Sequence, residues 1–420
     1  MAVMAKRPVR LPGFFISLAF ICLTACSSVK PVSEYNLAHL YSQNPTVRVQ
    51  FSVAASSEEI RVFCQLDFPY PEAAASQPAF WQKYRIRYEI RPGFESSRLL
   101  RRDSIGSEQY IRGSGSRPVF QITLPLKGEQ PACVLLLSIG LRNSSEEVVF
   151  PFYIPAGDPA EMPGFALFRG KGKIPVAGNM ARAGDTLSIR SLDFRKNKLK
   201  VDFCPFSPSV AMPPMASVPV LDSTDEAMFP VAIKPDEELI FREAGFYRVQ
   251  DPEGTSGFSF LLGAEDFPSL TRAEELAGPM IYISTRDERK SLFESDNPKL
   301  AIDQFWLKIT PQKDRARELI KKYFVNAENA NRLFSNFKEG WKTDRGMVLL
   351  IFGPPLQVFQ SRDTEIWVYD KSQGPENAVF YFFRRPAGNL ADIWELRRQG
   401  DYDKIWYGVV DLWRKGIIDR

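Results

Sequence analysis

The stretch GWKTDRGMVLLIFGPP, residues 340–355, decides how the last part of this chain folds. It contains an apolar run at 347–352, which follows a turn rich in glycine and charge and precedes Gly353-Pro354-Pro355. A short continuous apolar run between turn residues predicts a buried strand. The Gly-Pro-Pro sequence predicts that this strand stops and that the chain turns.

The residues ahead of the apolar run suit a turn between a helix and a strand. Thr343 and Asp344 can accept hydrogen bonds from backbone N–H groups. Gly340 and Gly346 can adopt positive φ at little cost. Trp341 can fix the turn against the preceding helix by burying a large apolar area. These properties predict a folding signature.

Gly340-Trp341-Lys342-Thr343-Asp344 resembles the motif of the GWxTD-domain family of bacterial envelope proteins. The match covers about residues 270–385 and includes Tyr282-Ile283, Phe305-Trp306, Asn329-Ala330-Asn331, Arg345-Gly346 and Glu365-Ile366-Trp367. The resemblance implies an envelope protein and carries over no catalytic role. The alternative to a folding signature is a solvent-facing site that uses Asp344, Arg345 and Trp341.

Residues 1–25 have the parts of a bacterial export signal. Three basic residues precede an apolar run at 14–23 that is too short to span a bilayer. Leu23-Thr24-Ala25-Cys26 resembles a lipobox, which implies cleavage before Cys26 and its diacylation by fatty acids such as palmitate. Ser27 follows, which by analogy implies sorting to the outer membrane, where we expect the periplasmic face. An ordinary signal peptide that ends near a cysteine is the alternative.

The charge and the rarer residue types exclude several function classes. The formal net charge is +4, and loss of the three basic signal residues leaves about +1, which argues against nucleic-acid binding. His39 is the only histidine, which excludes Ser-His-Asp catalysis and histidine-rich metal centres. Cys64 and Cys133 are either a disulfide pair or ordinary buried thiols, and their spacing resembles no metal site. We expect no metal and no cofactor.

The chain between the signal and residue 264 predicts a tether and two β-rich domains. Residues 26–44 are polar and mixed, which is typical of a tether. About six strands of period-two alternation in residues 45–155 predict an immunoglobulin-like β-sandwich. A linker rich in proline and glycine follows at 155–159, and residues 160–264 predict a second, smaller sandwich.

Residues 269–420 predict an α+β domain. An apolar stripe at helical spacing predicts a long helix from Asp314 to about Phe334. The other expected elements are helix starts at Thr271, Thr285 and Asn297, strands at 347–352, 365–369 and 378–383, and a helix at 401–415. The expected fold is therefore two β-sandwich domains followed by an α+β GWxTD domain.

Six of the seven tryptophans lie in the predicted α+β domain. Trp394, Trp406 and Trp413 have charged neighbours, and tryptophan is enriched at interfaces and can stack on sugars. They are interface candidates, with core packing as the alternative. Asp392 and Glu395 would share a face if their segment were helical, which is the remaining pattern for carboxylate catalysis on glycans.

Together these features predict a lipid-anchored protein of the outer membrane that acts without catalysis as a binding or assembly module. Its expected partner is another envelope protein, such as a membrane β-barrel or a secretion machine, and no nucleic-acid partner is expected. The alternative is a protein that binds or processes glycan or peptidoglycan through exposed tryptophans and carboxylates. A C-terminal domain that serves only as a structural cap is a third hypothesis. Fold alone does not decide between them.

Overall fold

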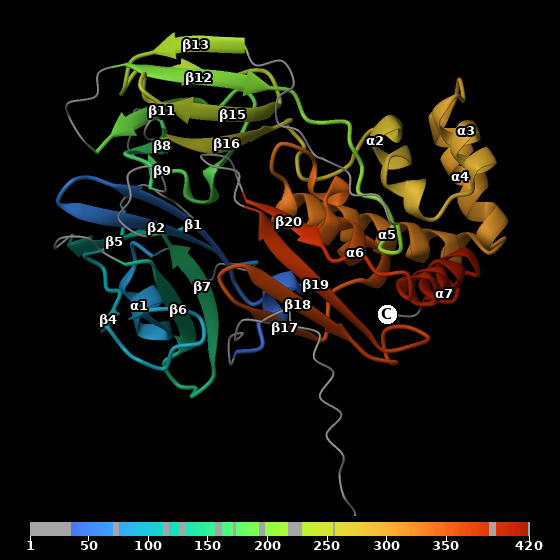
Figure 1. Ribbon diagram of the computed structural model, residues 1–420, viewed down its shortest axis with the longest axis horizontal. Helices are drawn as coiled ribbons and strands as arrows, with labels where there is room; N and C mark the ends of the chain where they lie inside the picture. Colours follow the sequence, from blue (N-terminus) through green and yellow to red (C-terminus); the bar gives the residue numbers. More distant parts are fainter. Residues whose placement is uncertain are drawn as a thin grey trace, which may run out of the picture. The chain divides into compact units, whose positions relative to one another are not determined.

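β-Sheets build the described part of the chain up to residue 263, and helices and one further sheet follow (Figure 1). The computed structural model describes residues 35–69, 75–111, 117–125, 131–155, 162–170, 174–192, 198–216, 229–254, 257–385 and 392–418. Cys26 and the predicted signal at residues 1–25 lie outside these residues, as do most of the linker residues at 155–159. Within the described ranges, none of the helices has the length and apolar character needed to cross a membrane.

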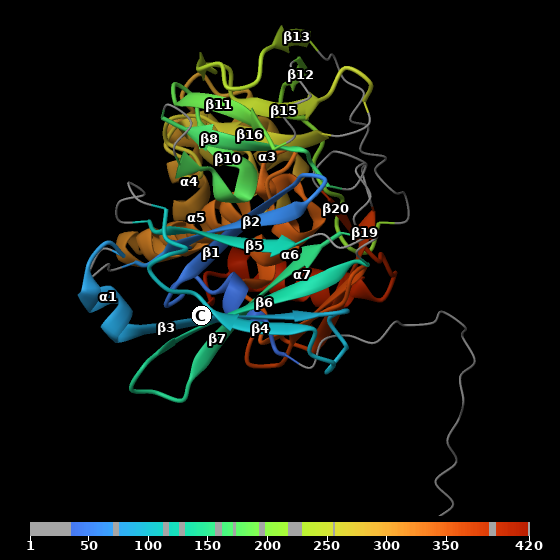
Figure 2. The same ribbon diagram turned by 90° about the vertical axis from the view of Figure 1, so that its left-hand side faces the viewer.

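The first β-rich region contains two antiparallel sheets that contribute to one hydrophobic core (Figure 2). Its elements are β1 (Arg48–Ala55), β2 (Glu59–Asp67), α1 (Pro78–Lys83), β3 (Tyr84–Arg91), β4 (Arg101–Ser104), β5 (Val119–Pro125), β6 (Cys133–Leu141) and β7 (Glu147–Ile154). The strand orders are β1-β2-β5 and β4-β3-β6-β7. Alternation along the strands places Ile60 and Val62 from β2 in the same core as Leu135 and Leu137 from β6.

The second β-rich region also contains two sheets around one core. Its elements are β8 (Phe165–Arg169), β9 (Ile174–Pro175), η2 (Ala177–Asn179), β10 (Met180–Arg182), β11 (Thr186–Ser191), β12 (Leu199–Cys204), β13 (Phe229–Ile233), β14 (Leu239–Ile240), β15 (Gly245–Gln250) and β16 (Gly257–Gly263). The orders are β10-β16-β15-β12-β13 and β14-β11-β8-β9. β10 runs parallel to β16, and the other strand pairs of this region are antiparallel.

Cys64 is a buried free thiol, so the structure contains no disulfide between Cys64 and Cys133. Both side chains belong to the core of the first β-rich region. Burial raises the pKa of the Cys64 thiol to about 12, because the charged thiolate loses its hydration there. Of the two alternatives, the ordinary buried cysteine is the one observed.

The C-terminal part combines helices with a four-stranded antiparallel sheet of order β17-β18-β19-β20. Its elements are α2 (Ala273–Ala277), η3 (Pro279–Tyr282), α3 (Arg286–Phe293), α4 (Pro298–Ile309), α5 (Lys313–Phe334), η4 (Gly340–Lys342), α6 (Asp344–Phe352), β17 (Gln357–Gln360), β18 (Thr364–Tyr369), β19 (Ala378–Arg385), β20 (Ile393–Leu396) and α7 (Tyr402–Arg414). The predicted long helix, the strands at 365–369 and 378–383 and the last helix are confirmed.

The strand predicted at residues 347–352 is wrong, because these residues form most of α6. Every residue from 346 to 352 is buried. A helix that is buried on all sides has a continuous apolar sequence, and its period cannot be distinguished from that of a buried strand.

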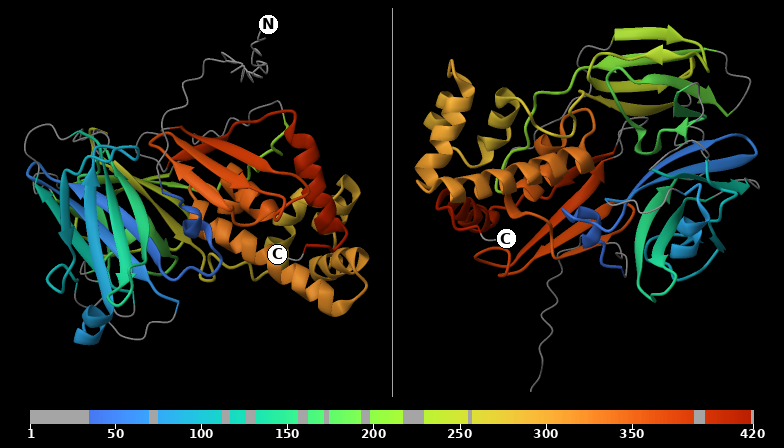
Figure 3. Two further views of the ribbon diagram at one scale, coloured as in Figure 1. Left: turned by 90° about the horizontal axis from the view of Figure 1, so that it is seen from below. Right: turned by 180° about the vertical axis from the view of Figure 1, so that it is seen from behind.

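The described end of the expected tether is part of the folded protein rather than a spacer. Leu37 is 1% exposed and belongs to the core of the C-terminal part. Its N–H donates to the carbonyl of Val358 on β17 at 2.8 Å, and the N–H of Val358 donates to Asn36 Oδ1 at 3.0 Å. The 3₁₀ helix η1 (Ala38–Tyr41) follows, beside the sheet in Figure 3. These bonds occupy an edge strand, which otherwise exposes unpaired backbone groups.

Candidate functional site

The GWxTD turn joins α5 to α6 and provides the N-cap and the first residue of α6. The Thr343 hydroxyl accepts a hydrogen bond from the N–H of Gly346 at 3.0 Å and donates one to the carbonyl of Gly340 at 2.7 Å. This is the arrangement of a helix N-cap, in which a side-chain oxygen satisfies an unpaired backbone donor. Thr343 therefore accepts a backbone bond as predicted, although the turn lies between two helices.

Gly340 and Gly346 lie where no side chain fits. Neither Gly340 nor Gly346 has positive φ, so that prediction is wrong. A Cβ atom on Gly340 would collide with the carbonyl of Ala330 in α5, and one on Gly346 would collide with the carbonyl of Gly340. Gly353 differs, because its φ of +74° ends α6 in a conformation that favours glycine. Pro354 and Pro355 follow this helix end rather than the end of a strand.

Trp341 is buried and fixes the turn against α5, as predicted. Its backbone N–H donates to Asn331 Oδ1 at 3.2 Å, and its ring packs edge to face on the ring of Tyr282 with centroids 6.3 Å apart. A large aromatic side chain in such a position contributes by area and by ring geometry. Trp341 therefore connects η4, α5 and η3.

Asp344 is held by charge-assisted hydrogen bonds on both carboxylate oxygens. Oδ1 lies 2.6 Å from Arg398 Nη2, whereas Oδ2 accepts from Arg398 Nη1 at 3.0 Å and from the N–H of Leu396 at 2.7 Å. The Asp344 and Arg398 side chains are 10% and 15% exposed. A bidentate pair of this kind is strong and geometrically specific. Asp344 thus ties the start of α6 to β20.

Arg345 continues this network into the core. Its guanidinium lies 3.1 Å from Glu365 Oε2 and stacks on the rings of Phe334 and Trp394, at 4.6 and 4.9 Å from their centroids. The fully buried Glu365 carboxylate also accepts from Tyr41 Oη at 2.7 Å. Burial and the Glu365 charge raise the pKa of Tyr41 well above its usual value, so the phenol stays a donor. Contacts made by Asp344, Arg345 and Trp341 favour a folding signature over a solvent-facing site.

The interface predicted at the last tryptophans is wrong for two of them. Trp406 and Trp413 are 2% and 1% exposed, and Trp413 Nε1 donates to the carbonyl of Ile351 at 2.9 Å. Both lie on the apolar face of α7, while the charged neighbours lie on its other face. Trp394 is partly buried beneath Arg345. These positions remove the exposed tryptophans on which the glycan hypothesis depends.

The carboxylates considered for catalysis do not share a helical face. Glu395 lies on strand β20 and Asp392 directly precedes it. Asp392 pairs with Arg384 at 2.8 Å, and Glu395 pairs with Arg385 at 2.9 Å. They form cross-strand ion pairs of the kind that stabilise a sheet.

A groove with a volume of about 700 Å³ lies beside the motif. The proline-rich loop of residues 205–216 forms one wall, because the N–H of Ala211 donates to the carbonyl of Lys342 at 2.9 Å. Apolar side chains in the lining are Phe206, Val210, Leu270, Ile281, Phe293 and Trp341. The lining also includes Glu265, Asp266 and Glu274, which make no ion pair with another described residue. The basic lining residues Arg272 and Lys342 pair with Glu275 and Glu339, so the groove is apolar with a border of net negative charge.

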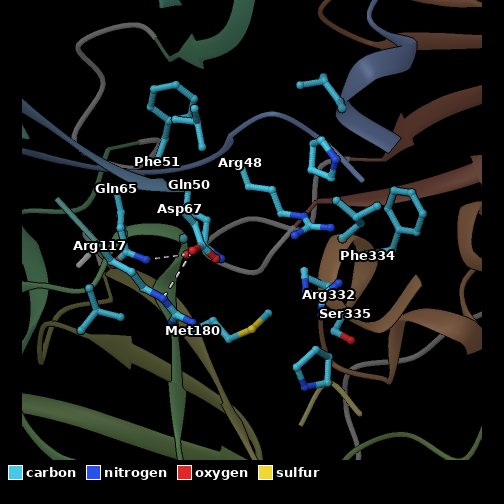
Figure 4. A pocket seen from close by; sticks show the side chains of 18 of the residues that line it. Arg48, Gln50, Phe51, Gln65, Asp67, Arg117, Met180, Arg332, Phe334 and Ser335 are labelled. Atoms are coloured by element: carbon cyan, nitrogen blue, oxygen red, sulfur yellow. Dashed lines mark hydrogen bonds and ion pairs between the residues drawn. The ribbon is translucent and has the colours of Figure 1, made fainter. Parts of the chain in front are cut away.

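A second, cationic cavity of about 620 Å³ lies between β1, β2, residues 176–182 and the end of α5 (Figure 4). Its charged lining residues are Arg48, Arg117, Arg169, Arg182, Arg332 and Arg345, together with Asp67 and Asp266. This cavity was not predicted from the sequence. Its arginines come from elements far apart in the chain, and no local pattern marks them.

Comparison with known proteins identifies one segment of the chain. No curated protein matches the sequence. Residues 245–415 match the family model of the GWxTD domain. The matched segment starts at β15, earlier than the expected boundary, and includes the whole network around Trp341 and Asp344. The chain therefore carries a GWxTD domain at residues 245–415.

Proposed function

We propose that this chain is a lipid-anchored envelope protein that acts, without catalysis, as a docking module for another envelope protein. The observation that carries the docking role is the groove beside the GWxTD motif. An exposed apolar depression with a polar border is typical of protein-binding surfaces. Because Glu265, Asp266 and Glu274 make no direct ion pair with another described residue, the partner presents an apolar segment that carries basic residues.

The anchor and the two β-rich regions complete this proposal. Cys26 carries the lipid, and the protein faces the periplasm from the outer membrane. Ten residues separate Cys26 from Leu37, so an extended chain between them spans at most about 40 Å. Such a short connection keeps the GWxTD domain close to the membrane surface. Each β-rich region is a β-sandwich that serves as a spacer, with the immunoglobulin-like arrangement expected for the first.

The docking role is tested by affinity purification from the native envelope with paired variants. Phe293 is 54% exposed in the groove, and Leu99 is 44% exposed in the first β-rich region, so neither substitution removes a core side chain. We expect one envelope protein to copurify with the wild type and with Leu99→Ala. The same protein should be lost with Phe293→Ala combined with Glu274→Lys. Equal recovery with both variants would contradict the proposal.

The anchor is tested separately by Cys26→Ser. We expect the wild type in the outer-membrane fraction with incorporated labelled palmitate. The variant should lose the label and leave that fraction. Outer-membrane retention without the cysteine would show that another feature anchors the protein.

A further inference from the structure

Two arginines face the cationic cavity without a carboxylate partner. Arg48 and Arg332 both extend toward the open space in Figure 4. Arg48 donates to the carbonyl of Gln43 at 3.1 Å, and Arg332 donates to Asn329 Oδ1 at 2.7 Å. Neither guanidinium makes an ion pair with a described residue. Since a guanidinium has five N–H donors, most of their binding capacity is still available.

The paired arginines of the same cavity provide an internal contrast. Arg117 lies 3.6 Å from Asp67, Arg169 lies 2.9 Å from Asp185, and Arg345 lies 3.1 Å from Glu365. Arg182, the remaining arginine, has an exposed side chain. Arg48 and Arg332 are therefore the partly shielded arginines of this lining that make no direct ion pair with a described residue.

Burial destabilises the charged forms of Arg48 and Arg332. Burial lowers the pKa of Arg48, and the nearby charge of Arg332 lowers it further. Burial also lowers the pKa of Arg332, and the charges of Glu328 and Asp67 offset only part of this shift. Arginine remains protonated in proteins, so the two cations persist side by side in the cavity. An anion placed between them would relieve both the repulsion and the lost hydration.

We propose that this cavity binds a phosphate group through Arg48 and Arg332. Two guanidinium groups match the double charge of a phosphate monoester or pyrophosphate and can each bind it in bidentate fashion. Gln50, Gln65 and Ser335 line the same space and offer further polar atoms. The volume of about 620 Å³ lies in the range of small-molecule sites. The phosphate therefore belongs to a larger molecule, either soluble or a lipid headgroup. The cavity adjoins the proposed docking groove, and Asp266 lines both, but Arg48 and Arg332 line the cavity and not the groove.

Calorimetric titration of the purified protein with pyrophosphate tests the proposal. We expect saturable binding to the wild type and at least tenfold weaker binding to Arg48→Gln and Arg332→Gln. Arg169→Gln is the matched control, because it removes an arginine from the same cavity that Asp185 already neutralises. Its affinity should stay within threefold of the wild type. Absence of binding to the wild type, or equal loss in all three variants, would overturn the proposal.

Thermal unfolding without anion provides a second readout. Arg332→Gln should melt at or above the wild-type temperature, because it removes a repulsive charge. A large loss of stability or a failure to fold would identify Arg332 as a structural residue and overturn its role in binding.

Binding to vesicles that contain phosphatidic acid, compared with phosphatidylcholine vesicles, distinguishes a lipid headgroup from a soluble phosphate ligand. Binding to the former that depends on Arg332 indicates a lipid headgroup, whereas binding of pyrophosphate alone indicates a soluble ligand.

Discussion

The GWxTD turn and the cationic cavity both hold charged side chains away from bulk water, but they treat those charges differently. At the turn, Asp344 and Arg398 neutralise each other through two bonds of 2.6 and 3.0 Å. In the cavity, Arg48 and Arg332 have no carboxylate within ion-pair distance among the described residues. The comparison separates charges that stabilise the fold from charges that remain available to a ligand.

Buried charge that is fully paired is difficult to reconcile with binding or catalysis, because a ligand would have to displace the existing partners. Asp344 accepts three bonds, and Glu365 is shared by Arg345 and Tyr41. The motif that names the domain therefore acts mainly on folding. We expect substitutions there to lower stability and substitutions at the unpaired arginines to spare it.

The largest effect is expected for Asp344→Ala. Removal of the carboxylate leaves Arg398 and the N–H of Leu396 without their partner, which should lower the free energy of unfolding by about 3–5 kcal/mol. Urea denaturation measures this change. Asp303→Ala is the control, since its pair with Lys299 lies on an exposed helix face and should contribute under about 1 kcal/mol. Similar effects for both variants would show that the buried pair contributes no more to stability than an exposed one.

Gly340→Ala tests the close approach of η4 to α5. The added Cβ meets the carbonyl of Ala330, so the two segments must separate, at a cost of roughly 1–3 kcal/mol. Gly400→Ala adds the same atom where no neighbour lies within 4 Å, and its stability should stay near that of the wild type. Thermal melts of the two variants give the result. A Gly340→Ala protein as stable as the wild type would show that the close approach of η4 to α5 does not require glycine.

Thr343→Ala should have a smaller effect, because it removes the N-cap of α6 while leaving the core in place. The expected loss is about 1–2 kcal/mol by urea denaturation. Thr343→Ser retains the hydroxyl that accepts from Gly346, so it should recover most of the loss. If serine is no better than alanine, the cap is not the source of the effect.

The smallest effect is a pH dependence at Glu288, another paired carboxylate. Burial raises its pKa, but hydrogen bonds from Arg414, the Thr285 N–H and Lys308 outweigh this and lower it to about 2. The contribution of Glu288 is complete above about pH 4.5, its usual pKa, and is lost as the pH falls toward 2. We therefore expect Glu288→Gln to reduce the slope of unfolding free energy against pH between these values. Equal slopes for variant and wild type would contradict this account.

Local patterns predicted the elements with clear periodicity. The stripe over α5, the alternation in β2 and the apolar run in β6 required no knowledge of distant contacts. The same reasoning failed at α6, whose apolar sequence carries no period. Its boundaries still carried a signal, because Thr343 fits an N-cap and Gly353 fits a helix end.

The site residues were harder to predict, since their roles depend on contacts between distant segments. Trp406 and Trp413 are seven residues apart with Val409 and Val410 between them, and this helical spacing favours burial, although their charged neighbours led to the interface prediction. No local sequence pattern predicted that Leu37 docks on β17, because a few apolar residues in a polar segment are also typical of a tether. The cavity likewise depends on arginines from separate elements, and only the folded chain brings them together.

The most direct test measures unfolding free energies of Asp344→Asn and Arg332→Gln with and without pyrophosphate. We predict that Asp344→Asn is strongly destabilised but still gains stability from pyrophosphate, because its cavity is intact. Arg332→Gln should be as stable as the wild type without the anion and should gain little from it. If Arg332→Gln instead loses as much stability as Asp344→Asn and keeps the full response to pyrophosphate, the distinction between paired structural charges and available binding charges is wrong.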